Sequence, residues 1–266
     1  MTTRNSRGTT LAIVQARMSS TRLPGKVLAP VVGEPMIVQQ LRRIARAERL
    51  DGIVVAVPAD SGDDDLASVV ADTGVDVVRG ALNDVLDRFM SVLATYDADV
   101  IVRLTADCPL ASPTVIDDVI SAFHDSQADY VSNTMAPTYP DGLDVEVVTA
   151  EALRKVASTS HDSAEREHVT LGIYRRPGMF IIENFSDPTG RDNSQMRWTV
   201  DNAEDLEFVR WVYASLTERP FDYPEILELL ELHPDRIRTG KDAKRNAALD
   251  GLDTGVMQHR QSGATS

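Results

Sequence analysis

Three permanent positive charges follow directly on the first apolar segment of the chain. Residues 10–16 predict a buried strand, and Arg17, Arg22 and Lys26 lie in the ten residues after it. A loop at the carboxyl end of a strand is where α/β sheets bind ligands. Cationic side chains, backbone N–H donors near Gly25 and the hydroxyls of Ser19, Ser20 and Thr21 suit phosphate oxygens. The sequence therefore predicts a triphosphate-binding loop, which we favour over a solvated basic turn.

This loop differs from the two common glycine-rich phosphate motifs. A Walker loop requires Gly-x-x-x-x-Gly-Lys-Ser/Thr, whereas here Ser20 stands five residues before Gly25 and Val27 follows Lys26. The hydroxyl that binds magnesium in that motif is therefore missing. The dinucleotide fingerprint Gly-x-Gly-x-x-Gly does not occur either. We therefore expect neither a P-loop NTPase nor a dinucleotide-binding protein.

Two aspartates that are distant in sequence each stand between a predicted strand and a predicted helix. Asp107 follows the apolar strand of residues 99–104, and Asp201 precedes the helix that begins at Ala203. Two carboxylates can hold Mg²⁺ when substrate phosphates and waters complete its shell. Each aspartate could instead cap the helix that follows it. Only the combination with the basic loop favours a metal site.

Composition excludes several classes of protein. The 266 residues fit one large domain, and the formal charge of −14 argues against a general binder of nucleic acid or anionic membranes. The single cysteine, Cys108, allows no intrachain disulfide, which suits a reducing compartment. Neither an apolar signal segment nor a run of roughly 18 to 20 apolar residues is present. We therefore expect a cytoplasmic protein without a membrane partner.

Strands and helices alternate through the first half of the chain. The apolar patterns predict strands at 10–16, 52–57, 75–78, 99–104 and 128–132, and helices at 36–50, 84–96 and 113–124. The acidic cluster of residues 63–65 is expected to cap a further helix. This order predicts an α/β protein with a mostly parallel sheet that is covered on both faces.

The pattern changes after a turn at residues 140–142. Residues 143–147 alternate strictly, which on a strand would place Asp144 and Glu146 on one face. We expect helices from Ala150 and over 163–174, and on the latter Arg166 and His168 do not share a face. Beyond them we expect strands at 179–185 and 195–199 as a small antiparallel extension, and helices at 203–216 and 223–232.

Five sequence blocks in a fixed order resemble the sugar-acid cytidylyltransferases, the superfamily of 3-deoxy-manno-octulosonate and acylneuraminate cytidylyltransferases. The most specific block reads Gln-Ala-Arg at 15–17 and Leu-Pro-Gly-Lys at 23–26, and the others lie at 103–110, 142–146, 165–169 and 198–206. The resemblance covers roughly residues 12–216 and is greatest to the spore-coat polysaccharide biosynthesis branch. Residues 81–83 lack the Ser-Gly-Thr run of the octulosonate enzymes.

The resemblance implies a role for each matching residue. The nucleotide would contact Ala16, Arg17, Lys26, Arg88, Thr105 and Asp107, with Arg88 near the cytosine. Asp107 and Asp201 would bind Mg²⁺, and with Arg17 and Lys26 they would form the catalytic set. Asp144, Glu146, Arg166 and His168 would build the acceptor pocket.

The resemblance also implies an architecture and a reaction. We expect a three-layer α/β/α, Rossmann-like nucleotidyltransferase fold of the GT-A type. Its acceptor and dimerisation arm would lie at about 140–198. The polar composition and lack of periodicity separately predict a flexible leader at 1–9 and a disordered tail at 239–266, which leaves a single domain over residues 10–238. The expected reaction moves CMP from CTP to a small acidic acceptor, such as a sugar acid, and releases pyrophosphate. The family likeness predicts a homodimer.

Two other functions remain open at this point. A GT-A glycosyltransferase would use a nucleotide sugar, but its usual Asp-x-Asp metal motif is incomplete here, because residue 105 is a threonine. A noncatalytic nucleotide-binding or assembly protein would bind CTP without turnover. The presence of Arg17, Lys26, Asp107 and Asp201 argues against loss of activity.

Overall fold

The structure is a computed structural model that describes residues 8–217 and 220–240. Most of the expected leader and almost all of the expected tail lie outside these residues. None of the helices within the described ranges is long and apolar enough to cross a membrane.

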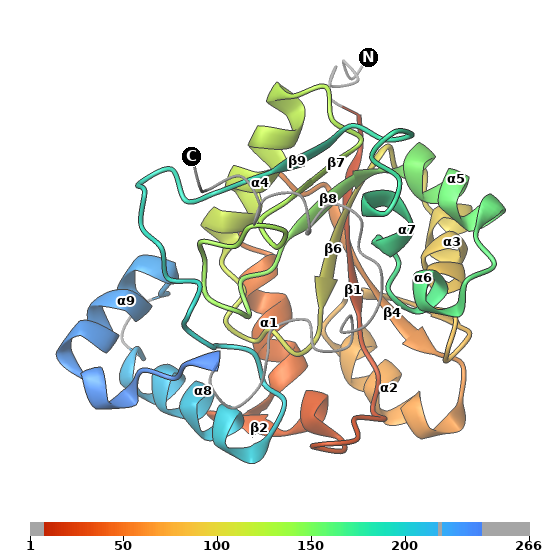
Figure 1. Ribbon diagram of the computed structural model, residues 1–266. Helices are drawn as coiled ribbons and strands as arrows, with labels where there is room; N and C mark the ends of the chain where they lie inside the picture. The colour runs from red at the N-terminus through yellow and green to blue at the C-terminus, as the bar shows by residue number, and fades with distance from the viewer. Residues whose placement is uncertain (1–7, 218–219, 241–266) are drawn as a thin grey trace, which may run out of the picture.

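A seven-stranded mixed sheet forms the centre of the molecule (Figure 1). Its strand order is β5-β4-β1-β6-β8-β7-β9. The strands are β1 (Thr10–Gln15), β4 (Gly52–Pro58), β5 (Asp76–Gly80), β6 (Val100–Thr105), β7 (Tyr130–Ser132), β8 (Glu146–Thr149) and β9 (Ile182–Asn184). The first four in the sheet order, β5 to β6, run parallel, while β8 is antiparallel to both of its neighbours. A separate antiparallel pair joins β2 (Pro30–Val31) to β3 (Glu34–Pro35). The expected fold class is confirmed.

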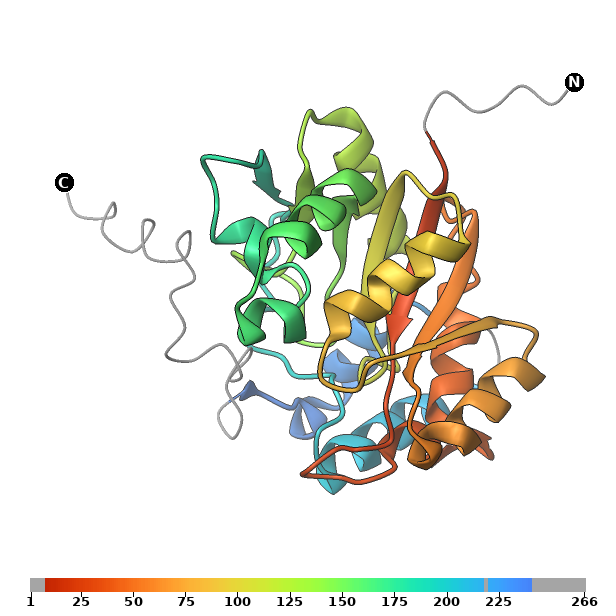
Figure 2. The same ribbon diagram turned by 90° about the vertical axis from the view of Figure 1, so that its right-hand side faces the viewer.

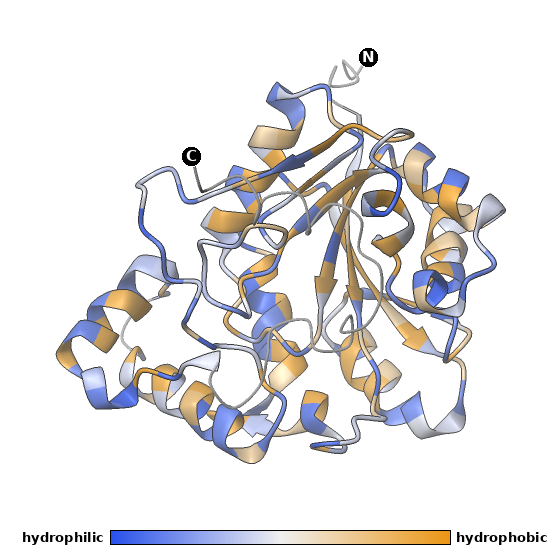
Figure 3. Ribbon diagram, viewed as in Figure 1, coloured by the Kyte–Doolittle hydropathy of each residue, from blue (hydrophilic) through white to orange (hydrophobic). Residues whose placement is uncertain are grey.

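Helices cover both faces of the sheet because its inner strands are apolar on both sides. Along β1, Ala12 and Val14 pack into one hydrophobic cluster, and Leu11 and Ile13 pack into the other. The first cluster includes residues of α1 (Met36–Ile44), α2 (Asp64–Asp72), α4 (Pro113–Asp125), α8 (Ala203–Ser215) and α9 (Tyr223–Leu232). The second includes residues of α3 (Val85–Thr95), α5 (Ala150–Thr159) and α7 (Leu171–Tyr174). Figure 2 shows α3 and α5 side by side, and Figure 3 shows the hydrophobic strands between the two layers.

The single helix expected over residues 163–174 is divided in two. α6 spans Ser163–Glu167, and α7 begins only at Leu171. Between them Val169 has φ 41°, a left-handed conformation that is unusual for a β-branched residue. The break turns the chain at His168, which has consequences for the site.

Two expected strands differ from the structure. The alternation at residues 143–147 forms a strand only from Glu146 onward, because the Asn133 side chain takes the place of a neighbouring strand just before it. Its Nδ2 donates to the carbonyl of Leu143 at 2.7 Å, and its Oδ1 accepts from the N–H of Val145 at 2.9 Å. Residues 195–199 form only isolated bridges, Asp141 with Arg197 and Met196 with Thr239. The extension is also not purely antiparallel, since β9 runs parallel to β7.

Candidate active site

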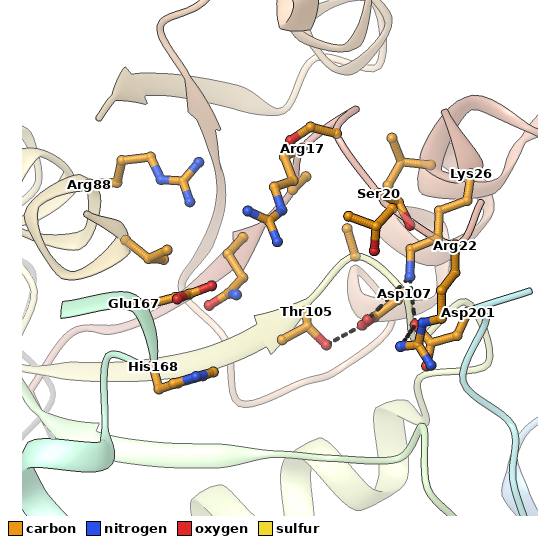
Figure 4. Close-up of a pocket in the computed structure, with 17 residues that line it drawn as sticks. Arg17, Ser20, Arg22, Lys26, Arg88, Thr105, Asp107, Glu167, His168 and Asp201 are labelled. Atoms are coloured by element: carbon orange, nitrogen blue, oxygen red, sulfur yellow. Dashed lines mark hydrogen bonds and ion pairs between the residues drawn. The ribbon is translucent and has the colours of Figure 1, made fainter. Parts of the chain in front are cut away.

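A cavity of about 300 Å³ opens at the carboxyl ends of β1 and β6 (Figure 4). These strands are neighbours, and Gln15 at the end of one pairs with Thr105 at the end of the other. The lining residues come from five segments: Gln15, Ala16, Arg17, Ser19–Arg22, Lys26 and Val27; Thr105–Asp107; Val85 and Arg88; Glu167 and His168; and Asp201. The cavity therefore lies where parallel sheets of this kind bind ligands.

The cationic loop after β1 is folded by contacts within itself and with a buried carboxylate. Gly25 adopts φ 71° and donates its N–H to the carbonyl of Met18 at 3.0 Å. Asp63 is buried and accepts the N–H of Met18 at 2.6 Å. We expected Asp63 to cap the following helix, but it makes no capping hydrogen bond there. Its carboxylate is used to hold the loop instead.

One end of the cavity is a dense network of opposite charges. The Lys26 ammonium nitrogen lies 3.5 Å from Asp107 Oδ2, 3.1 Å from Asp201 Oδ1 and 2.6 Å from the carbonyl oxygen of Val200. Arg22 approaches the same oxygen of Asp201 at 2.9 Å. Burial acts to raise the pKa of Asp201, but the cations around it, Lys26 first, hold that pKa below its ordinary value. Asp201 is therefore ionised at neutral pH.

Neither aspartate is used as a helix cap. The N-cap of α4 is Ser112, and the N-cap of α8 is Asn202, which forms a reciprocal capping box with Asp205. The carboxylates of Asp107 and Asp201 are thus free to face the Lys26 ammonium, a cation placed between them. This arrangement fits a hard divalent cation held by two carboxylates, with other oxygen ligands supplied by substrate. Among the described residues no group of three or more metal-binding side chains occurs.

The opposite end of the cavity contains a buried cation that lacks hydrogen-bond partners. Arg88 is 2% exposed, and its Nε and Nη1 atoms have no partner in the described part of the chain. Burial, followed by the charge of Arg17, lowers its pKa. Gly80 makes room for it, since a Cβ there would lie 2.7 Å from Arg88 Cγ. Burying donors without acceptors costs free energy, so this site is built to receive an oxygen-rich or nitrogen-rich ligand.

The break after α6 brings Glu167 and His168 to the same cavity (Figure 4). Burial lowers the pKa of His168, which favours a neutral imidazole at pH 7. Arg166 points elsewhere: it forms an ion pair with Asp84 and donates to the carbonyls of Ala157 and Ser160, each at 3.3 Å. The described chain therefore places only one of these two expected acceptor-binding residues at the cavity.

Glu146 and Asp144, which we also expected in the acceptor pocket, are not among the residues that line this cavity. Glu146 is buried in the sheet, where it pairs with Arg103 and accepts from Tyr130 Oη and Thr170 Oγ1, both at 2.6 Å. Its strand begins at that residue, so Asp144 does not share a strand face with it. Glu146 instead holds the turn after His168 through Thr170.

Sequence reasoning identified part of the cavity lining. Ala16, Arg17, Lys26, Arg88, Thr105, Asp107, His168 and Asp201 come together as expected. Arg22 and the three loop hydroxyl residues Ser19, Ser20 and Thr21, which we expected to add to the triphosphate loop, also line it. We assigned no role to Gln15 or Glu167, which line it as well. No sequence signal indicated Glu167, because only the end of α6 directs it inward.

A mostly parallel sheet between two helical layers, with a cationic loop after β1 and two carboxylates that face one lysine, is an arrangement that suits a nucleotidyltransferase. A family model described as cytidylyltransferase matches residues 11–232. The spore coat polysaccharide biosynthesis protein SpsF of Bacillus subtilis (strain 168) is 35% identical over 231 residues, 85% of this chain and 95% of that protein. The chain belongs to the cytidylyltransferase family, and the expected membership in the sugar-acid cytidylyltransferase superfamily is confirmed.

Two solved structures are similar to this chain in fold. A cytidylyltransferase from Leptospira borgpetersenii serovar Hardjo-bovis (strain JB197) matches with TM-score 0.81 and 30% identity, covering 86% of this chain and 96% of that one. CMP:2-keto-3-deoxy-manno-octonic acid synthetase, solved as a complex with CTP, shares the fold with TM-score 0.62 and 18% identity, covering 78% and 99%. The comparisons favour an enzyme of this class over a glycosyltransferase or a noncatalytic protein.

Proposed function

We propose that the protein transfers CMP from CTP to a small acidic acceptor, a sugar acid or a similar compound, and that it needs Mg²⁺. The observation that carries the proposal is the position of Lys26 between Asp107 and Asp201. This group lies in the same cavity as the unpartnered Arg88. One end thus suits a metal–triphosphate and the other suits a base. The name of SpsF, which refers to polysaccharide biosynthesis, supports a sugar-derived acceptor.

In this proposal the chain supplies charge and orientation, not a nucleophile. An oxygen of the acceptor forms a bond to the α-phosphorus of CTP, and the bond from that phosphorus to the bridging oxygen breaks. Negative charge then builds on the departing pyrophosphate, where Arg17, Arg22 and Lys26 stabilise it. Bound Mg²⁺, held by Asp107 and Asp201, would neutralise phosphate oxygens and favour the same displacement. Neutral His168 is suited to contact the acceptor or to take its proton.

We also propose that the chain forms a homodimer through the segment at about 140–198. The strand β9 lies at the edge of the sheet, and two apolar side chains just before it are exposed: Met179 at 48% and Ile181 at 55%. An exposed edge with apolar neighbours favours pairing with a second copy. Analytical ultracentrifugation of the protein and of Ile181→Lys tests this: the wild type should sediment as a dimer, and a wild-type monomer would contradict the proposal.

Pyrophosphate release tests the proposed reaction. The four nucleoside triphosphates are each combined with sugar acids, sugar phosphates and phosphonates, with and without Mg²⁺. We expect release with CTP, an acidic acceptor and Mg²⁺, and none after chelation with EDTA. Asp107→Asn is the low-activity control, because it keeps the shape of the side chain and removes its charge. Pyrophosphate release that persists in EDTA would contradict the requirement for Mg²⁺. A folded protein that releases no pyrophosphate with any combination of nucleotide and acceptor would contradict the proposed CMP transfer.

A further inference from the structure

Arg197 is buried next to the carboxylate of Asp201 and has no role in the proposed CMP transfer. Its side chain is 3% exposed. Its Nη2 contacts Asp201 Oδ2 at 2.5 Å and Asp205 Oδ2 at 3.5 Å, and its Nη1 contacts Asp141 Oδ2 at 2.8 Å. A single guanidinium therefore joins three carboxylates from two separate parts of the chain.

This contact divides the two oxygens of Asp201 between different partners. Arg197 binds Oδ2, whereas Lys26 and Arg22 approach Oδ1 at 3.1 and 2.9 Å. Carboxylates rotate readily about their last torsion, so nothing within Asp201 itself selects an orientation. The planar fork of an arginine does select one, because it bonds in fixed directions. Arg197 thereby presents Oδ1 to whatever cation occupies the cavity.

The other end of the guanidinium ties Asp201 to the turn at residues 140–142. The Asp141 carbonyl accepts the N–H groups of Trp198 at 2.6 Å and Thr199 at 3.0 Å. Gly142 has φ 114°, and a Cβ there would lie 2.6 Å from the nitrogen of Thr199. This close approach requires glycine. The turn is thus fixed on the segment that carries Asp201.

The same segment also holds the backbone of Asp107. The Val200 N–H donates to the carbonyl of Asp107 at 2.8 Å, and Thr199 Oγ1 donates to it at 3.1 Å. Residues 197–201 therefore set the separation of Asp107 and Asp201. A change at Arg197 would alter the cation site without touching the cation.

We infer that Arg197 is a positioning residue for the cation site, which orients Asp201 and couples it to Asp141. The inference rests on the proposed assignment of Asp107 and Asp201 to the divalent cation. Outer partners of metal ligands typically contribute about 10- to 100-fold to metal affinity. Lysine at this position would keep the charge but lose the ability to bond Asp201 and Asp141 together.

Mn²⁺ binding tests this role without relying on turnover. Free Mn²⁺ is followed by EPR as it is titrated into the protein with α,β-methylene-CTP, a nonhydrolysable analogue. For Arg197→Lys we expect the Mn²⁺ Kd to rise about 10- to 100-fold. Arg238→Lys is the matched control, because Arg238 contacts Asp205 at 3.0 Å but makes no described contact with Asp201. Its Kd should equal that of the wild type.

A second variant keeps the test decisive if Arg197→Lys does not fold. Asp141→Asn should also raise the Mn²⁺ Kd, although Asp141 does not itself bind the cation in this proposal. If Arg197→Lys and Asp141→Asn both fold and both bind Mn²⁺ with the wild-type Kd, the positioning role of Arg197 is overturned, whereas the metal assignment is not. The same conclusion follows if Arg238→Lys raises the Mn²⁺ Kd as much as Arg197→Lys does. A wild type that does not bind Mn²⁺ would overturn the metal assignment, and this inference with it.

Discussion

The two ends of the cavity differ in whether their charged side chains have partners within the chain. At the cation end, Asp201 has Arg22, Lys26 and Arg197 within 2.9, 3.1 and 2.5 Å, so each charge already has a partner. At the other end, Arg88 is fully buried and its Nε and Nη1 lack partners among the described residues. The first arrangement is preorganised for charge that develops during reaction. The second is completed only by a ligand, so the two ends should respond differently to mutation.

The largest effect is expected at the cation end. Asp107→Asn should lower kcat about 10²- to 10³-fold, since preorganised charge at a reacting centre contributes on that scale. The Tm should change little, because the Asp107 side chain is 34% exposed. Steady-state kinetics and thermal melting measure both quantities. Asp72→Asn, on the exposed face of α2, is the control. A variant with wild-type kcat would remove Asp107 from the site.

A smaller and different effect is expected at the Arg88 end. Arg88→Met should raise KM for CTP about tenfold or more with a smaller change in kcat, because lost uniform binding appears in KM. Its Tm should equal or exceed that of the wild type, because methionine removes the buried Nε and Nη1 donors, which lack acceptors and whose burial costs free energy. Kinetics with varied CTP and a thermal melt measure these changes. A large fall in Tm would show that Arg88 stabilises the fold.

The smallest effect is a difference in pH dependence between two residues of the cavity, His168 and Asp201. The pKa of His168 is lowered in the folded state, so the unfolded chain binds its proton first and stability falls as pH drops below about 6.5. The pKa of Asp201 is also lowered, so its contribution is present above about 3.9 and is lost as pH falls further. Melts of His168→Asn and Asp201→Asn from pH 8 to 3 should therefore flatten separate parts of the stability profile. If both variants changed the stability profile over the same pH range, the two residues would not act at separate pH values as proposed.

The fold could be predicted from the sequence more completely than the site. The strands and helices of the first half follow from apolar periodicity, which depends only on nearby residues. The break between α6 and α7 does not, because Thr170 is held by Glu146 from another part of the chain. The structure also gives Asp63 and Glu146 other contacts than we expected, because their partners come from distant parts of the chain. Their partners, Met18 and Arg103, lie 45 and 43 positions away.

The sequence by itself determined the alternation of strands and helices in the first half of the chain, the cations from Arg17 to Lys26, and the positions of Asp107 after β6 and of Asp201 before α8. These features depend on local composition and on the rule that parallel strands end at one edge. Only the tertiary structure decided which charges meet. In the structure Asn202, and not Asp201, caps α8, so the Asp201 carboxylate faces the cavity. Arg88 is buried with no partner for its Nε and Nη1 among the described residues. The reason is physical: a charged group's partner is set by contacts between distant segments, which no local pattern specifies.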